Sequence, residues 1–168
     1  MPKTHELDDL DRQLLALLME DAKRPYTDLA KQLFVSGGTI HVRINKLIEA
    51  GVVKGQTLVV DPIALGYDIT SFLGVYLQQS SLYDEVSDNL RRIPEIVAAH
   101  YTTGVYSIFI KVICRDTDHL RVVLQKIQEV KGIQRTETFI ALEESINRPV
   151  QVLTNAELDE LNSRVYKE

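Results

Sequence analysis

The amino-acid sequence predicts an α+β protein, in which an N-terminal winged helix-turn-helix is followed by a ferredoxin-like βαββαβ domain. Two observations predict this class. Apolar residues recur at helical spacing up to Asp61-Pro62, whereas strand-like and helix-like runs alternate after it. A local excess of basic residues also coincides with the third predicted helix, although the chain of 168 residues has a net charge of −5. We therefore expect domains at 1–62 and 63–143 and a polar tail at 144–168.

Three short helices are predicted before residue 50. A leucine stripe with acidic residues in its first turn predicts a helix over 8–21, and Arg24-Pro25-Tyr26 breaks it. Thr27 is expected to cap the second helix. Ser36 is expected to cap a third helix that ends near Glu49 and turns four residues inward, namely Ile40, Ile44, Leu47 and Ile48.

The segment VVKGQTLVV, at residues 52–60, follows Gly51 and contains two short β runs around Lys54-Gly55-Gln56. This pattern predicts a hairpin that ends at Asp61-Pro62. Three helices followed by a small hairpin make a winged helix-turn-helix, in which the second and third helices form the DNA-reading pair.

The second half alternates between strand and helix patterns. The predicted strands cover 69–77, 97–103, 106–114 and 133–142. The predicted helices cover 82–93 and a segment that is capped by Thr117 or Asp118 and ends at Gly132. This order is the split βαβ arrangement. In the tail, Thr154-Asn155-Ala156-Glu157 fits a capping box at the start of a terminal helix.

The sequence contains no motif for catalysis or metal binding. Phosphate loops and a nucleophile elbow are absent, and the histidines lack metal-ligand spacing. Cys114, the single cysteine, lies in the apolar run IFIKVIC, so a buried core thiol is expected. No apolar run reaches the roughly 18 residues of a transmembrane helix. We expect a soluble, reduced, cytoplasmic protein without a metal, a cofactor or a membrane partner.

Local charge favours DNA binding at one face. Residues 22–60 carry six basic and two acidic side chains, a net charge of +4, whereas residues 1–21 carry −4. The basic excess therefore lies where phosphates would be met.

At 100° per residue, the third helix turns Thr39, His41, Val42, Asn45 and Lys46 outward or sideways. Asn45 suits an adenine edge, His41 a base edge or a phosphate, and Val42 a thymine methyl group. The expected backbone contacts come from Arg43, Lys46, Lys54 and the N–H groups that follow Ser36, at Gly37 and Gly38. Arg43 and Lys46 each fit a solvated helix surface about as well, so the prediction depends on the combination.

Several segments resemble one known family. LDDLDRQLLALLMEDAKRPYTDLAKQLFVSGGTIHVRINKLIEAGVV resembles the N-terminal domain of the AsnC/Lrp family of feast/famine transcription regulators. HYTTGVYSIFIKV resembles the effector loop of the family's C-terminal domain, and IQRTETFIAL resembles its last strand. The resemblance covers residues 6–142 and is strongest with asparagine-responsive members.

The resemblance implies a sequence-specific regulator of transcription that binds double-stranded DNA. It also implies a homodimer, built through the C-terminal domains and often assembled into octamers, with a small amino acid, asparagine being favoured, bound between subunits. The dimer is physically reasonable, because two helices on one face of a four-stranded sheet leave its other face uncovered. Phe72, Gly74 and Tyr76, or the residues that alternate with them, would need a partner there.

The resemblance also assigns effector residues. Gly104 would allow N–H groups to approach a carboxylate closely, and the second wall is expected from an adjacent subunit. The implied residues are Tyr101, Thr102, Thr103, Gly104, Val105, Ser107 and His119 on one side, and Gln134, Arg135, Thr136, Glu137 and Thr138 on the other. Without the resemblance, Thr102–Gly104 fits an ordinary turn, and Thr136 and Thr138 fit ordinary strand positions.

Three positions depart from the family pattern. Gly37 replaces a common proline at the first position of the reading helix, which leaves that end less preorganised. Ser107 replaces a common aspartate, so a ligand ammonium group would depend on carbonyls and Glu137. His100 replaces a common tyrosine.

Two alternatives stay open at this point. A small-molecule metabolic enzyme would use the C-terminal α+β domain and would need convergent acid–base residues around 101–107. A regulator of the same fold without any effector is the third hypothesis.

Overall fold

A computed structural model describes residues 6–164. The chain divides into two compact units, each with its own hydrophobic core. The helical unit contains the chain up to Leu58 together with the segment from Arg148 onward. The sheet unit contains Val59–Asn147. None of the helices in the described part of the chain is long and apolar enough to cross a bilayer.

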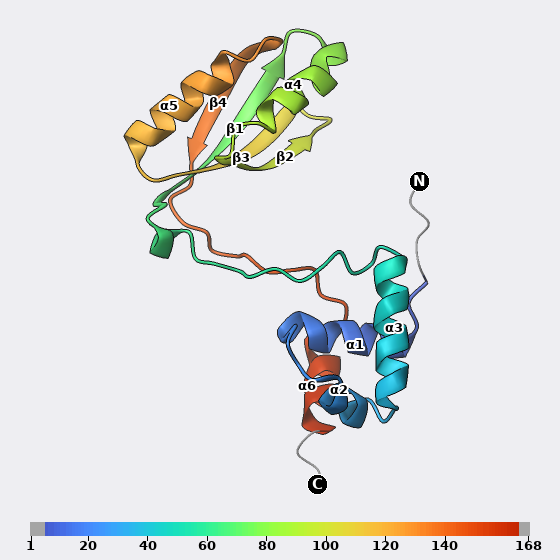
Figure 1. The fold of residues 1–168 in the computed structure, drawn as a ribbon. Coiled ribbons are helices and arrows are strands. Elements are labelled where there is room, and N and C mark those ends of the chain that lie inside the picture. Colours follow the sequence, from blue (N-terminus) through green and yellow to red (C-terminus); the bar gives the residue numbers. More distant parts are fainter. Residues whose placement is uncertain (1–5, 165–168) are drawn as a thin grey trace. The chain divides into compact units, whose positions relative to one another are not determined.

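The helical unit contains α1 (Asp9–Glu20), α2 (Tyr26–Gln32), α3 (Gly37–Glu49) and α6 (Asn155–Ser163) (Figure 1). The predicted Ser36 cap is confirmed, because its Oγ accepts a hydrogen bond from the Thr39 N–H at 3.0 Å. The predicted Thr27 cap is wrong. Instead α2 begins at Tyr26, behind Pro25, whose fixed φ suits a helix start.

The core of the helical unit is made by the apolar stripes of its helices. Ile40, Ile44 and Leu47 of α3 are buried as predicted, but Ile48 is 51% exposed, so its predicted inward orientation is wrong. Among the buried side chains are Leu14, Leu17, Leu29, Ala30, Leu33, Ile40 and Ile44. The turn between α2 and α3 places Phe34 at φ +54°, a conformation that bulky residues rarely adopt.

The predicted hairpin is not formed. The described residues 52–61 contain no strand, and Leu58 and Val59 are 81% and 88% exposed. A two-stranded ribbon is marginal unless it packs on other structure, and these side chains find no such support within the described chain. The helix-turn-helix prediction is therefore confirmed, whereas its wing is not.

The sheet unit confirms the βαββαβ prediction. Its strands are β1 (Ile69–Leu77), β2 (Ile96–Tyr101), β3 (Ile108–Cys114) and β4 (Ile133–Ile140), paired antiparallel in the order β2-β3-β1-β4. The helices α4 (Tyr83–Leu90) and α5 (Thr117–Gln128) cover one face of the sheet (Figure 1). Short 3₁₀ helices lie at Ile63–Leu65 and Ser80–Leu82.

Strict alternation along β3 separates the two faces of the sheet. Ile108, Ile110, Val112 and Cys114 are buried under the helices, while the residues between them face the other way. Cys114 is fully buried, which confirms the predicted core role. This burial raises the pKa of its thiol.

Several predicted boundaries in the sheet unit are corrected. The first helix is shorter than 82–93, and β3 begins at Ile108 rather than Tyr106. The cap of α5 is Asp116 instead of Thr117 or Asp118, because the Asp116 carboxylate accepts the His119 N–H at 2.7 Å. The helix α5 ends at Gln128, four residues before Gly132, so the predicted end at Gly132 is wrong. Gly132 instead has φ +93° in the turn that leads into β4.

Candidate DNA-reading helix and effector loop

The outer face of α3 presents the side chains predicted to meet DNA. His41, Val42, Asn45 and Lys46 are exposed, and Val42 reaches 65% exposure. The inner face of the same helix is anchored by buried apolar residues in the helical core. Burial of one stripe therefore fixes which residues of α3 face outward.

His41 and Asn45, one turn apart, are joined by a hydrogen bond. The Asn45 Nδ2 lies 3.1 Å from His41 Nε2, and because the amide nitrogen only donates, the imidazole nitrogen accepts. One N–H and the carbonyl oxygen of Asn45 remain, which is the donor–acceptor pair that an adenine edge requires. This contact pre-orients the amide on the exposed face.

Arg43 has partners that sequence reasoning did not identify. Its Nη1 forms ion pairs with the Asp8 carboxylate and, at 3.1 Å, with Asp11 Oδ1 at the start of α1. The Asp11 side chain is 3% exposed, so the pair is partly buried. The Asp11 N–H and Arg43 together lower the pKa of Asp8. The predicted phosphate contact of Arg43 stays a prediction, and it competes with these two carboxylates.

The other basic side chains of residues 22–60, where the net charge is +4, differ in whether they form an ion pair. Arg24 pairs with Glu20, with Nη2 and Oε2 3.8 Å apart. Four lysines are exposed and form no ion pair among the described residues, namely Lys23, Lys31, Lys46 and Lys54. Lys54 lies in the segment that lacks the predicted hairpin. Within residues 22–60, lysines therefore supply the positive charge that is not in an ion pair.

The N-terminus of α3 is open to close approach. Gly37 and Gly38 are exposed, and a Cβ built on Gly37 would meet no atom within 4 Å. Because the first N–H groups of a helix lack intrahelical partners, this end can receive an anionic group.

The predicted effector loop connects β2 and β3. The Thr102 N–H donates to the Ser107 carbonyl at 3.1 Å, and the Thr102 hydroxyl donates to the Tyr106 carbonyl. Thr103, Gly104 and Val105 are exposed at its tip. The Tyr101 ring contacts the Tyr83 ring of α4 in a tilted arrangement, with ring centroids 4.2 Å apart. The loop is therefore closed at its base and accessible at its tip.

Glu137 joins the two predicted walls within one chain. Its Oε1 accepts the Tyr76 hydroxyl at 3.0 Å, and its Oε2 accepts the Tyr106 hydroxyl at 2.8 Å. Arg135 lies 3.3 Å from the Glu137 carboxylate and stacks on the Tyr76 ring at 3.9 Å. These hydrogen bonds lower the pKa of Glu137 and raise that of Tyr106. The arrangement offers a carboxylate fixed on both oxygens.

Gly74 makes room for this cluster. A Cβ on Gly74 would lie 2.2 Å from Cδ1 of Tyr106, so the tyrosine ring occupies the space above the glycine. In the sheet register, Gly74 pairs with Phe109 on one side and with Glu137 on the other. Sequence reasoning left open whether Gly74 and Tyr76 or the residues that alternate with them lie on the uncovered face, and it missed Tyr76 and Tyr106 as partners of Glu137. The period-two pattern of ITSFLGVYL is the signal that places Tyr76 and Gly74 on one face.

The other predicted effector residues are not all brought together. Thr136 and Thr138 pair with Val75 and Leu73, so they lie on the helix-covered side, away from Glu137. Gln134 is exposed. His119 lies beyond Cys114, at the opposite end of β3 from the loop, where its Nε2 is 3.1 Å from Glu95 Oε1. Within one chain, His119 therefore does not border the loop.

Comparison with known proteins agrees with this division. Residues 7–48 match the AsnC-type helix-turn-helix domain, and residues 70–151 match the Lrp/AsnC ligand binding domain. Regulatory protein AsnC of Escherichia coli (strain K12) is 45% identical over 146 residues, which cover 86% of this chain and 96% of that protein. An HTH-type transcriptional regulator of Pyrococcus horikoshii is 37% identical over 136 residues, covering 81% and 89%. Because these relatives are regulators, the enzyme alternative is not favoured.

Solved structures agree as well. The structure of E. coli AsnC matches with a TM-score of 0.85 at 44% identity and covers 88% of this chain and 99% of that one. A feast or famine regulatory protein from M. tuberculosis, complexed with L-methionine, matches with a TM-score of 0.82 at 25% identity, with coverage of 88% and 100%.

Proposed function

Because the chain belongs to the Lrp/AsnC family of transcription regulators, we propose that it reads specific operator sequences with α3 and that a small amino acid, asparagine in the first place, controls this binding in a cytoplasmic homo-oligomer. The observation that carries the DNA-reading proposal is the exposed face of α3, where Val42, Asn45 and Lys46 stand on an anchored helix. Base-edge contacts would come from Asn45 and Val42, and phosphate contacts from Lys46.

The DNA proposal is tested by binding to the operator region of its own gene over a series of salt concentrations. Lys46→Ala should weaken binding to all sequences alike and reduce the slope of log K against log salt by about 1. Asn45→Ala should weaken binding mainly to the specific site, by roughly 1–3 kcal/mol. Lys131→Ala, which removes an exposed lysine of the sheet unit, is the matched control. Absence of any specific binding by the unaltered protein would overturn the proposal.

The effector proposal places the ligand carboxylate at the N–H groups of the exposed Thr103-Gly104-Val105 tip. The Glu137 carboxylate would face the ligand ammonium group, either in one chain or across subunits. The L-methionine complex of the M. tuberculosis relative supports an amino acid as the ligand class. The resemblance to asparagine-responsive members and the 45% identity to E. coli AsnC support asparagine within that class.

Calorimetry and thermal unfolding against the twenty amino acids test the effector. A true ligand at 100 times its Kd should stabilise the protein by about 2.7 kcal/mol. Gly104→Ala should weaken ligand binding without lowering stability, since its Cβ would meet no neighbour within 4 Å. Stabilisation by no amino acid would favour a regulator without an effector, and turnover of a small molecule would favour the enzyme alternative.

A homodimer is the proposed basic assembly, because the face of the sheet away from α4 and α5 carries aromatic side chains. Phe72 and Phe109 stack at 5.9 Å there, and Phe139 remains 48% exposed. A second copy would cover this face and would place two reading helices about 34 Å apart, or a multiple of that distance. Mass measurement in solution, with and without asparagine, distinguishes a dimer from an octamer. A monomer at all concentrations would refute the assembly.

A further inference from the structure

The C-terminal helix α6 packs into the core of the helix-turn-helix unit. Leu161 is 1% exposed and belongs to the same buried cluster as Leu14 and Leu17 of α1 and Leu29 of α2. The match to the ligand binding domain ends at residue 151, before α6 begins. The helix is therefore an addition to the part of the chain that the family domains account for.

Gln32 at the end of α2 shows that the helix-turn-helix is built to receive α6. The residue is 5% exposed, which is unusual for a glutamine unless its amide has partners. Its Nε2 donates to the Leu161 carbonyl at 3.0 Å and to Asn162 Oδ1 at 3.3 Å. Both partners of this buried donor thus come from α6, and its removal would leave the amide without them.

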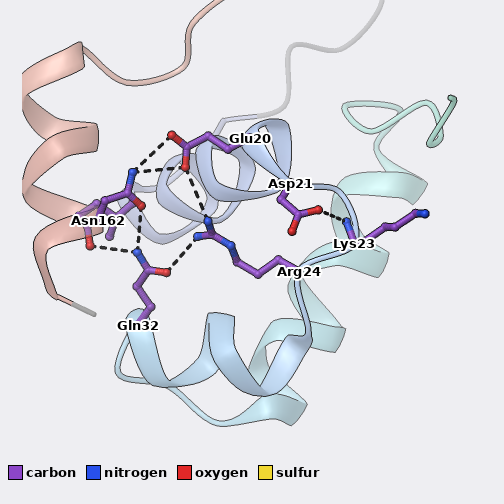
Figure 2. Close-up of polar contacts among 7 residues, drawn as sticks. Glu20, Asp21, Lys23, Arg24, Gln32 and Asn162 are labelled. Carbon is purple, nitrogen blue, oxygen red and sulfur yellow. Dashed lines mark hydrogen bonds and ion pairs between the residues drawn. The ribbon is translucent and has the colours of Figure 1, made fainter. Parts of the chain in front are cut away.

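A closed ring of polar contacts continues from Gln32 through α1 (Figure 2). Asn162 Nδ2 donates to both carboxylate oxygens of Glu20 at 3.3 Å. Arg24 connects Glu20 to Gln32. Its Nη2 lies 3.8 Å from Glu20 Oε2, and its Nη1 donates to Gln32 Oε1 at 3.1 Å. The ring connects α1, α2 and α6 and seats the helix in one register.

The approach to α6 is also defined. The Thr154 N–H donates to Glu157 Oε2 at 2.7 Å, and Thr154 Oγ1 accepts the Glu157 N–H at 3.3 Å, which completes the predicted capping box. Just before it, Leu153 packs against the helical core. Ala16 and Met19 of α1 line an apolar groove together with Leu153 and Leu158. Local capping and apolar contact thus both direct the tail onto α1.

We propose that α6 is the fourth helix of the DNA-reading unit and that full DNA affinity requires it to be docked. The buried cluster that contains Leu161 also contains Ile40 and Ile44, the residues that anchor α3. Loss of α6 opens this cluster to water and loosens the support of the reading helix. The stability part of this inference is independent of the proposed function, whereas the affinity part rests on the DNA-reading role of α3.

The test uses the full chain with Leu161→Asp, which places a charge in the core. Ala156→Asp is the matched control, because it introduces the same residue at an exposed position of the same helix. Hydrogen exchange is followed in α1 and α2, with β1–β4 as the internal reference, in the absence of DNA and amino acids. Leu161→Asp should speed exchange in α1 and α2 by at least about tenfold and leave the sheet unchanged, while Ala156→Asp should change neither.

Milder variants keep the proposal testable if Leu161→Asp unfolds the whole unit. Gln32→Ala and Asn162→Ala should each speed exchange, and their combined effect should be smaller than the sum of the two, because the hydrogen bond between Gln32 and Asn162 is lost in both. Operator affinity should fall in every variant that speeds exchange. Unchanged exchange in Leu161→Asp would overturn the docking, and faster exchange with full DNA affinity would overturn its role in reading. Failure of the unaltered chain to bind DNA would reject the proposed function, while the exchange result would still decide the docking.

Discussion

Glu137 illustrates how one side chain organises the open face of the sheet. Its two carboxylate oxygens accept hydrogen bonds from Tyr76 of β1 and from Tyr106 of the loop between β2 and β3. The same hydroxyl groups favour the ionised carboxylate and therefore lower its pKa. Position and charge of this group are thus set by the same two contacts.

The lowered pKa of Glu137 predicts a change in acid stability. Its contribution to folding is fully present above the ordinary value of 4.5 and is lost as the pH falls through the lower pKa of the folded state. Glu137→Gln keeps one acceptor oxygen, replaces the other oxygen by a donor NH2 group, and removes this titration. The midpoint temperature of thermal unfolding should therefore fall less steeply between pH 6 and pH 3 for Glu137→Gln than for the unaltered protein. Parallel curves would contradict the prediction.

Gly74 predicts a steric effect at the same place. Gly74→Ala should destabilise the sheet unit by about 1–3 kcal/mol, because the new Cβ overlaps the Tyr106 ring. Gly104→Ala is the control and should change the free energy of unfolding by less than about 0.5 kcal/mol. Chemical denaturation measures both. The loss of stability that Gly74→Ala causes should be smaller in a Tyr106→Ser background than in the unaltered protein. A loss of the same size in both backgrounds would show that the ring is not the cause.

At the scale of elements, side-chain caps begin α1 and α3, and cross-helix contacts join α1 to α3 and α2 to α6. Asp8 begins α1 with a capping box and also reaches Arg43 of α3. Ser36 caps α3, and Gln32 connects α2 to α6. The caps decide where helices begin, whereas the cross-helix contacts decide how they are joined.

Arg43→Ala should lower the stability of the helical unit by about 1–3 kcal/mol, because the nearly buried Asp11 loses its charged partner. Lys46→Ala, on the same helix and exposed, should leave stability unchanged and should weaken DNA binding. Thermal unfolding and salt-dependent DNA binding separate the two effects. If Arg43→Ala matches Lys46→Ala in both measurements, Arg43 acts on phosphate and its ion pairs contribute little.

At the scale of the molecule, the docking of α6 gives the two units a second covalent connection. The chain leaves the helical unit at Leu58 and returns to it at Arg148, after the strand that carries Glu137. A ligand-dependent change in β4 would therefore act on the reading unit through the returning segment as well as through the first one.

Flexible insertion into the second connection tests this coupling. A Gly-Ser segment placed between Asn147 and Arg148 should preserve α6 docking and amino-acid affinity, because it lies at the border between the units. It should reduce the effect of the amino acid on DNA affinity to less than about half of its original coupling free energy. Ligand titration of operator binding measures this effect. An undiminished effect would assign all coupling to the first connection or to the subunit interface.

Periodicity and capping patterns in the sequence determined the helix-turn-helix, the order of strands and helices along the chain, and the outward residues of α3, because these features depend on residues close together in the chain. The same patterns predicted a hairpin wing that is not formed at residues 52–61, since a hairpin also needs a surface to pack on. Only the tertiary structure decided that Arg43 pairs with Asp8 and Asp11, that Tyr106 reaches Glu137, and that Gln32 receives α6. These contacts join residues from 31 to 129 positions apart, and local sequence patterns carry no record of which distant partner a polar group will meet.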